Sequence, residues 1–276
     1  MSRPLCLLTI AGSDSGGGAG VQADLKTFAA HAVYGLSVVT SITAQNTLGV
    51  TDRLDLPATL VDRQLAAVLE DLPVDAIKIG MLGGGAIARV VARRLAGPLA
   101  AVPVVLDPVL LAGSGDPLLD EEAFEVLTGE LFGLATVATP NLPEARALAG
   151  EDGEPAVLGR ALARPGSAVL VKGGHGTDEM VEDVLVVGED VHRFRHRRLR
   201  SGKVHGTGCT LAAALAVRLA RGDELTAAVA GAIGYVRQAI EGSLRLGRGQ
   251  WVMTHPPEAA TGETSGIRIA TDPRLG

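Results

Sequence analysis

Short, continuous runs of apolar residues alternate with stretches of helical periodicity along most of the chain. Because strands that are covered on both faces have no polar side, such runs predict buried parallel strands. We expect these strands at Leu5–Ala11, Leu36–Ser41, Ala76–Ile79, Val102–Leu106, Thr136–Thr139 and Ala168–Lys172. Apolar residues three and four positions apart predict helices between them, at Leu60–Leu72, Ala86–Leu95, Glu121–Leu127, Leu142–Ala149, Cys209–Ala220 and Leu225–Leu244. This alternation predicts an α/β fold with a mostly parallel central sheet and helices on both faces.

Three further segments predict a small antiparallel part at the sheet edge. Val50–Leu56 follows a turn and has the length of a short edge strand. Val181–Val187 and Val191–Arg198 flank a three-residue turn and predict a hairpin. The sequence contains no recognisable linker or internal repeat, so we predict a single domain over residues 1–257. Residues 258–276 are polar and aperiodic, and we expect a flexible tail there.

Composition narrows the classes of function. Of the 276 residues, 47% are hydrophobic and 20% charged, which excludes an intrinsically disordered chain. Only 3% are aromatic, so Ala, Val and Leu must fill the core, and stacked rings for single-stranded nucleic acid are not expected. The net charge of −6 also argues against a partner that is a nucleic acid or an anionic membrane. These features favour an enzyme that acts on small molecules.

The cysteines and apolar runs predict a cytoplasmic location. Cys6 and Cys209 have no CxxC spacing, which argues against a disulfide framework or a cysteine-based zinc site and fits a reducing compartment. The first apolar run leads into Ser13 and Asp14 without a cleavage pattern, so we interpret it as a strand rather than a signal peptide. Arg218 interrupts the best candidate for a membrane span.

Polar residues follow the predicted strands repeatedly. In open parallel sheets, ligands bind beyond the carboxyl ends of the strands. We therefore expect the site to include residues from Gly12–Asp14, Gln45–Asn46, Met81, Asp107–Pro108, Pro140–Asn141 and Gly173–His175.

The glycine-rich stretch Ala11–Gly20 lies between a predicted strand and a helix. It contains no GxGxxG pattern, and it lacks the lysine of the GxxxxGK[ST] loop. A loop that lets a ligand approach the backbone and a loop that merely packs closely are both compatible with it.

The segment His205–Thr210 carries a stronger signal. Its glycines let backbone N–H groups converge, and the following helix start adds partial positive charge, so Gly206, Thr207 and Gly208 predict an anion site. The same field is expected to lower the pKa of the Cys209 thiol. The alternative is an ordinary helix start with a buried thiol. Upstream, Lys203 ends an alternating basic stretch and is the one member that we expect to contact phosphate.

Asn141, Glu144 and Lys172 support a phosphate site. Asn141 and Glu144 span a helix start, where they either form a capping pair or face hydrated Mg²⁺ and phosphate. Lys172 ends an apolar strand before two glycines, a position at which a nearby anion would keep the lysine charged.

The combined motifs resemble those of hydroxymethylpyrimidine/phosphomethylpyrimidine kinases of thiamine biosynthesis. The resemblance extends from about Leu5 to Leu246 and rests on Ala11–Thr27, Ala44–Thr47, Lys78–Leu82, Asp107–Val109, Ser114–Asp116, Thr139–Asn141, Lys172–His175 and His205–Thr210. It implies a ribokinase-like three-layer fold, a homodimer, ATP as co-substrate and Mg²⁺.

The resemblance also implies roles for individual positions. Asp24 and Gln45 would hydrogen-bond an aminopyrimidine, in a pocket lined by Gly12, Met81 and Val109. ATP and Mg²⁺ would be served by Asn141, Glu144 (to the metal through water) and Lys172. The anion hole and the catalytic base would be provided by Gly206, Thr207, Gly208 and Cys209.

The implied reaction is two successive transfers from ATP, first to the hydroxymethyl oxygen of 4-amino-5-hydroxymethyl-2-methylpyrimidine and then to the monophosphate. Two alternatives stay open. One is a pyridoxal or pyridoxine kinase on the same scaffold, and the other is a non-catalytic sensor that binds the pyrimidine phosphate.

Overall fold

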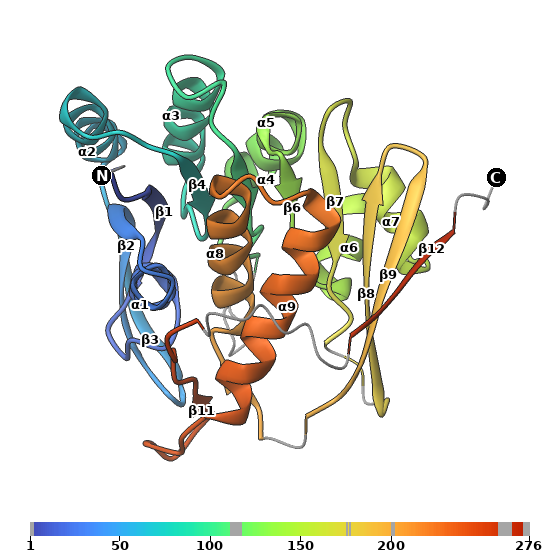
Figure 1. Cartoon of the computed structure of the whole chain (residues 1–276). Coiled ribbons are helices and arrows are strands. Elements are labelled where there is room, and N and C mark those ends of the chain that lie inside the picture. Colours follow the sequence, from blue (N-terminus) through green and yellow to red (C-terminus); the bar gives the residue numbers. More distant parts are fainter. Residues whose placement is uncertain are drawn as a thin grey trace.

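A ten-stranded sheet forms the middle of the molecule (Figure 1). The computed structural model describes residues 3–110, 118–174, 176, 178–199, 202–258 and 267–272. Within them the strands are β1 (Cys6–Asp14), β2 (Tyr34–Asn46), β3 (Gly49–Asp55), β4 (Ala76–Ile79), β5 (Val104–Leu106), β6 (Val137–Ala138), β7 (Ala168–Val171), β8 (Met180–Val187), β9 (Asp190–Arg197), β10 (Val204–His205), β11 (Trp251–Val252) and β12 (Arg268–Asp272). The order in the large sheet is β12-β9-β8-β7-β6-β5-β4-β1-β2-β3, and β10 pairs with β11 in a separate small sheet.

The central pairs of the sheet are parallel and its edges are antiparallel. All pairs from β2 through β1, β4, β5 and β6 to β7 are parallel, as the apolar runs predict. At one edge β3 folds back on β2, and at the other the hairpin β8–β9 continues from β7. The expected edge strand and the expected hairpin are both confirmed.

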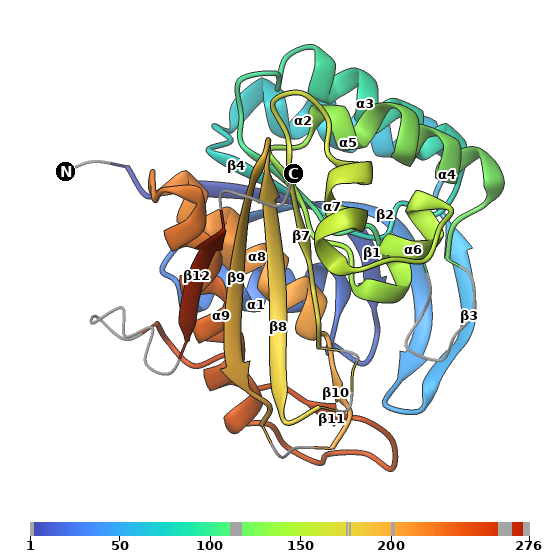
Figure 2. The same ribbon diagram turned by 90° about the vertical axis from the view of Figure 1, so that its right-hand side faces the viewer.

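Helices cover both faces of the sheet, which gives three layers (Figure 2). They are α1 (Gly20–Ala30), α2 (Ala58–Asp71), α3 (Gly85–Ala96), α4 (Glu121–Val126), the π-helical turn η1 (Leu127–Leu131), α5 (Phe132–Leu134), α6 (Leu142–Ala149), α7 (Pro155–Leu162), α8 (Thr207–Ala220) and α9 (Leu225–Glu241). One face packs on α1, α8 and α9, and the other packs on α2 to α7. None of the helices in the described ranges is both long and apolar enough to cross a membrane.

Successive residues of a strand point to opposite faces, so each buried strand feeds two cores. Leu7 packs in the core under α8 and α9, whereas its neighbour Leu8 packs in the core under α2 and α3. Helix α8 lies over the middle of the sheet with Ala212, Ala213 and Ala214 fully buried. The small side chains let its backbone approach the strands closely, which brings its first turn to the carboxyl ends of β4 and β5.

The C-terminal segment differs from its prediction as a flexible tail. Residues 268–272 form β12, which pairs antiparallel with β9, with Ile269 opposite Phe194. Glu258 accepts hydrogen bonds from Arg218 (3.0 Å) and Arg221 (2.6 Å), which fixes the start of the segment to the end of α8. The remaining tail positions, 259–266 and 273–276, lie outside the described residues. The described part of the tail is therefore attached to the domain.

Candidate active site

Two glycine-rich loops from distant parts of the chain pack against each other at the carboxyl ends of the strands. Gly206, which begins α8, has a φ of +83°, and a Cβ here would collide with the carbonyl oxygen of Gly18. Gly20 has a φ of +57°, and a Cβ here would collide with the carbonyl oxygen of Gly12. Only glycine fits these conformations and contacts. The first loop is thus a close-packing loop, and the same packing makes it a wall of the site.

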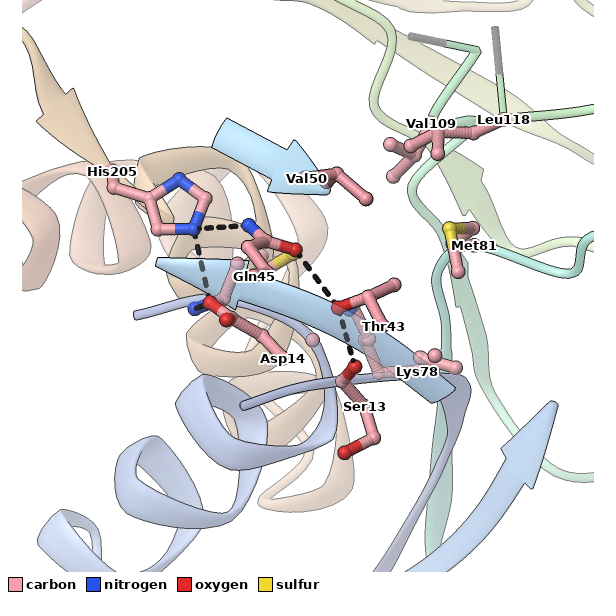
Figure 3. A pocket seen from close by; sticks show the side chains of 15 residues that line it. Ser13, Asp14, Thr43, Gln45, Val50, Lys78, Met81, Val109, Leu118 and His205 are labelled. Atoms are coloured by element: carbon pink, nitrogen blue, oxygen red, sulfur yellow. Dashed lines mark hydrogen bonds and ion pairs between the residues drawn. The ribbon is translucent and has the colours of Figure 1, made fainter. Parts of the chain in front are cut away.

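A cavity of about 90 Å³ opens beside these loops (Figure 3). It brings together four of the five residues predicted to bind substrate, since Gly12, Gln45, Met81 and Val109 all line it. The full lining is Ala11, Gly12, Ser13, Asp14, Ala19, Gly20, Thr43, Gln45, Val50, Lys78, Met81, Val109, Leu118, His205 and Cys209. The small volume and mixed lining suit one small polar ring.

Asp24 does not reach this lining. Its side chain is fully buried in α1, where it accepts hydrogen bonds from Lys78 Nζ at 2.8 Å and from Thr9 Oγ1 at 2.6 Å. Burial alone would lower the pKa of Lys78, but the neighbouring Asp24 carboxylate outweighs that effect and holds the pKa above its usual value. Both contacts are made by Oδ2, and Oδ1 is buried without a hydrogen-bond partner among the described residues, so a direct hydrogen bond between Asp24 and a ring stays a prediction. The carboxylate also pairs with Lys78, which lines the cavity.

Gln45 belongs to a chain of polar contacts along the cavity wall (Figure 3). Its terminal amide lies 2.8 Å from His205 Nε2 on one side and 3.1 Å from Thr43 Oγ1 on the other. His205 Nε2 also lies 3.0 Å from Asp14 Oδ2. Burial alone would raise the pKa of Asp14, but hydrogen bonds from His205 and from the backbone of Gly16 and Ala19 outweigh it and lower the pKa. Asp14 is consequently an ionised acceptor at neutral pH.

A second cavity, of about 600 Å³, adjoins the first. All the residues predicted to contact ATP line it, and an apolar wall is added by α8 and α9. The lining is Ala19, Asp107, Val109, Asn141, Glu144, Lys172, Gly174, Val181, Asp183, His196, Arg198, Leu199, Gly202, Lys203, Val204, His205, Gly206, Thr207, Gly208, Cys209, Leu211, Ile233, Val236, Arg237, Ile240 and Gln250. Its volume and its pairing of apolar with basic groups suit a nucleotide.

Lys172 and Asp107 form an ion pair at the mouth of the larger cavity. Lys172 Nζ lies 2.8 Å from Asp107 Oδ1, which also accepts a hydrogen bond from Thr139 Oγ1 at 3.2 Å. Burial opposes the charge on both groups, but each holds the other ionised, so the pKa of Lys172 is raised and that of Asp107 lowered. A Cβ on Gly208 would lie 3.2 Å from Lys172 Nζ. The lysine therefore stands against the glycine turn that begins α8.

Asn141 and Glu144 form the predicted capping pair and also lie at the larger cavity. They form a capping box on α6, in which Glu144 N donates to Asn141 Oδ1 (2.9 Å) and Asn141 N donates to Glu144 Oε2 (2.8 Å). Both also line the larger cavity. Burial raises the pKa of Glu144 to about 7, with the negative charge of Asp107 adding to the shift and Lys172 opposing it.

These residues fit a magnesium ion that is held largely by phosphate and water. Glu144 and Asp107 are two nearby carboxyl groups with one lysine between them, so a divalent cation would supply the missing positive charge and ionise Glu144. In the described ranges, no group of three or more His, Cys, Asp or Glu side chains is placed to hold a metal. Mg²⁺ typically keeps several waters and takes only one or two carboxylates beside substrate phosphates, so no protein cage is needed.

Cys209 stands where the two cavities meet. Ala19, Val109, His205 and Cys209 line both of them. Burial raises the pKa of the Cys209 thiol to about 11, although Lys78 opposes the shift. The expectation that the helix start lowers this pKa is therefore wrong, because desolvation and the carboxylates of Asp24 and Asp107 outweigh the helix field.

The first turn of α8 offers backbone donors at the same place. The first helical hydrogen bond runs from Thr210 N to Gly206 O (3.0 Å). The N–H groups of residues 206–209 precede it, so the helix itself supplies no acceptor for them. Residues 206–209 all line the larger cavity, and Cys209 also lines the smaller one, so an anion bound there would complete the hydrogen bonding of these N–H groups.

Several residues of the site were not assigned roles from the sequence. Lys78 lies inside an apolar strand, and a charged residue at such a position is itself a signal of a buried partner. His196 and Asp183, 3.3 Å apart, line the larger cavity together with Arg237, whose Nη1 donates to His196 Nδ1 (2.9 Å). No local pattern marks this triad, because β8, β9 and α9 bring it together from separate parts of the chain.

Comparison with known proteins assigns the chain to a family. Residues 14–254 match the model of the family described as Phosphomethylpyrimidine kinase. The chain belongs to this family. Over 251 residues it is 48% identical to the hydroxymethylpyrimidine/phosphomethylpyrimidine kinase of Rhizobium meliloti, an alignment that covers 88% of this chain and 93% of the relative.

Solved structures of related kinases have the same fold. The phosphomethylpyrimidine kinase of Clostridium difficile is 40% identical, with a TM-score of 0.74 and coverage of 86% of this chain and 99% of the other. The pyridoxal kinase of Staphylococcus aureus, in complex with AMP-PCP and pyridoxal, is only 29% identical but has a TM-score of 0.85, covering 98% and 99%. The ribokinase-like fold is thus confirmed.

Most motifs identified in the sequence lie at the two cavities. Those around Gly12, Gln45, Met81 and Cys209 line the small cavity, and those around Asn141 and Lys172 line the large one. The motif Ser114–Asp116 and the residue His175 lie outside the described residues.

Proposed function

We propose that the protein transfers a phosphoryl group from ATP to the hydroxymethyl oxygen of 4-amino-5-hydroxymethyl-2-methylpyrimidine and then a second one to the monophosphate. The observation that carries this proposal is that residues 206–209 line the nucleotide-sized cavity and that Cys209 among them also lines the small polar cavity. The hydroxymethylpyrimidine/phosphomethylpyrimidine kinase of Rhizobium meliloti, which is 48% identical, supports this choice of substrate.

Catalysis in this proposal rests on positioning and charge stabilisation. Gln45 holds the pyrimidine in the small cavity while Lys172, Asn141 and Lys203 contact the phosphates of ATP in the large one. The N–H groups of residues 206–209 stabilise the negative charge that develops on the migrating phosphoryl group. One such donor typically contributes about 10²–10³ in rate, and phosphoryl transfer requires little covalent help from the protein.

We expect Cys209 to contribute differently to the two transfers. With a pKa of about 11 it is a neutral thiol at neutral pH, so it can donate a hydrogen bond but is a poor base before substrate arrives. The first transfer must remove the proton of a hydroxyl group, whereas the phosphate acceptor of the second is already ionised. Loss of Cys209 is therefore expected to slow the first transfer more than the second.

Glu144 and Asp107 would hold Mg²⁺, with Glu144 acting through water. When bound, the ion neutralises the charge on the ATP phosphates. With Mg²⁺ bound, the carboxyl group of Glu144 would be ionised, because a nearby cation would oppose the effect of burial on its pKa.

The proposal includes a cytoplasmic homodimer. Ile42 and Leu54 are paired across β2 and β3 and share one face, where they are 50% and 65% exposed. Two copies that meet through this face would cover these side chains. Sedimentation of the full chain should give the mass of a dimer, and a monomer at micromolar concentration would contradict this part of the proposal.

A second candidate is a pyridoxal kinase, which the TM-score of 0.85 to the Staphylococcus aureus enzyme supports. The deciding experiment incubates the full chain with ATP, Mg²⁺ and either hydroxymethylpyrimidine or pyridoxal, and measures products by mass. We expect monophosphate and then diphosphate from the pyrimidine. Strong phosphorylation of pyridoxal with none of the pyrimidine would refute the proposal, and binding of the pyrimidine without ATP consumption would indicate a sensor.

The variant Cys209→Ala sharpens this experiment. We expect it to slow formation of the monophosphate by about 10²–10⁴, the range typical of general-base loss, and to slow conversion of added monophosphate much less. Equal rates in the variant and the unchanged protein for both transfers would remove Cys209 from the mechanism.

A further inference from the structure

The contacts of Asp14 determine the hydrogen-bonding role of His205. Asp14 Oδ1 accepts from Gly16 N (2.8 Å), and Oδ2 accepts from Gly18 N (3.0 Å) and Ala19 N (2.8 Å). These donors hold the carboxylate ionised, so it can only accept hydrogen bonds. His205 Nε2, 3.0 Å from Oδ2, must therefore carry a proton and donate it.

A donating His205 fixes the orientation of the neighbouring amide. The structure places the Gln45 amide nitrogen 2.8 Å from His205 Nε2 and the amide oxygen 3.1 Å from Thr43 Oγ1, but a donating His205 cannot satisfy a second donor. Because the oxygen and nitrogen of an amide are assigned from their hydrogen-bond partners, we exchange them, which turns the Gln45 oxygen toward His205 and the nitrogen toward Thr43. Thr43 donates its single proton to Ser13 O (2.9 Å) and is free to accept from that nitrogen. In this orientation Asp14 and Gln45 share the single Nε2 proton of His205, and no two donors face each other.

The Gln45 amide in this orientation would select one pattern of hydrogen-bond donors and acceptors on the edge of a ring. An amide presents one N–H and one oxygen lone pair side by side, which matches a ring nitrogen next to an amino group. With the oxygen toward His205 and the nitrogen toward Thr43, the amino group lies on the His205 side. In the pyrimidine the hydroxymethyl group is attached to the carbon next to the one that carries the amino group. It would therefore extend toward residues 206–209, which follow His205 directly.

The geometry points to His205, held as a donor by Asp14, as the positioning residue that sets the Gln45 amide and thereby makes the site select a 4-aminopyrimidine edge over a 4-oxo edge. This inference rests on the proposed function and deepens it. A 4-oxo ring presents the reversed pattern, with an N–H next to a carbonyl oxygen, and would need the opposite amide orientation. Gly18 contributes indirectly, because a Cβ there would lie 2.6 Å from His205 Cδ2.

The test compares the dissociation constants of two ligands by calorimetry without nucleotide. The ligands are 4-amino-5-hydroxymethyl-2-methylpyrimidine and its 4-oxo analogue, and the protein is the full chain. Because a matched two-bond contact typically discriminates by about 10- to 100-fold, the unchanged protein should prefer the amino compound by that factor. His205→Leu removes the donor while filling the space, and should reduce the preference at least about 5-fold. His205→Gln restores a donor and should largely keep it.

Two further variants separate positioning from a general loss of structure. Lys26→Met is the matched control, since Lys26 is exposed and donates to Gly17 O of the same loop (2.6 Å) without touching His205 or Gln45; it should leave the preference unchanged. Thr43→Val removes the acceptor for the Gln45 nitrogen and should lower the preference even if His205→Leu does not fold.

The outcomes are distinct. If His205→Leu and Thr43→Val weaken both ligands equally and leave the preference intact, or if the unchanged protein does not discriminate between two ligands that it binds, the inference is overturned. If the unchanged protein binds neither ligand, the proposed function fails instead.

Discussion

Two buried lysines form the same contact in different surroundings. Lys78 in β4 and Lys172 directly after β7 each lie 2.8 Å from an aspartate oxygen. The side chains of Lys78 and Asp24 are both 0% exposed, whereas those of Lys172 and Asp107 keep 13% and 4% exposure at the edge of a cavity. The distance is identical, so it does not distinguish a structural pair from a functional one. What distinguishes them is exposure: Lys78 borders the small cavity with neither partner exposed, whereas the Lys172 pair keeps some exposure beside the large one.

The largest expected effect is the loss of stability when the buried pair of Lys78 and Asp24 is disrupted. Lys78→Met leaves the Asp24 carboxylate buried without its cation, and such losses typically cost about 3–5 kcal/mol of unfolding free energy. The double variant Lys78→Met/Asp24→Leu should recover most of that loss, because two apolar side chains replace two charges. Urea unfolding of both variants measures this. A single variant as stable as the unchanged protein would show that the pair is not structural.

Substitution in the pair of Lys172 and Asp107 should lower activity more than stability. Lys172→Met should lower turnover by about 10²–10³, since it removes one charged donor from the migrating phosphoryl group. The stability loss should be smaller than for Lys78→Met, because Thr139 still donates to Asp107 and water reaches the cavity. Steady-state kinetics and urea unfolding test the two halves. A larger loss of stability than of activity would reverse the assignment of the two lysines.

The smallest expected effect is on the pH dependence of stability, through Glu144 near Lys172 and Asp107. Its pKa of about 7 lies above the ordinary value of 4.5, so the folded protein binds this proton more tightly than the unfolded chain. The free energy of unfolding contributed by Glu144 should therefore fall as pH rises from about 4.5 to about 7. Glu144→Gln should lack this contribution. Urea unfolding at several pH values in that window, without nucleotide or Mg²⁺, compares the two proteins, and parallel pH dependences would contradict the expectation.

The fold was largely predictable because its strands are buried on both faces. The strands β5 and β7 consist only of Val, Leu and Ala, and the buried runs of β4 and of the first part of β1 add only Lys78, Cys6 and Thr9 to aliphatic residues, so these runs favour strands. Helix α7 was missed, since Pro155–Leu162 is short and contains a glycine. Strand β12 was missed because its sequence is polar, and only pairing with β9 makes it a strand.

The site was predictable in its residues but less so in its electrostatics. Motif position brought Gln45, Met81 and Cys209 to one cavity, yet it carried no information on burial. The thiol pKa of Cys209 was therefore expected to fall, although desolvation raises it. This error has a physical cause. A local pattern reports the nearest backbone, whereas charge depends on what the whole fold packs around a group.

The contact between Gly18 and Gly206 joins segments 188 positions apart along the chain, as the residue numbers give (206 − 18). Neither partner has a side chain to shorten, so a bulky replacement at one cannot be compensated by trimming the other. Both positions should consequently remain glycine as the sequence diverges. A polypeptide truncated before α8 would retain most strands but would lack the proposed site of phosphoryl transfer. Phosphoryl transfer activity should therefore require that the first and last parts of the domain have packed together.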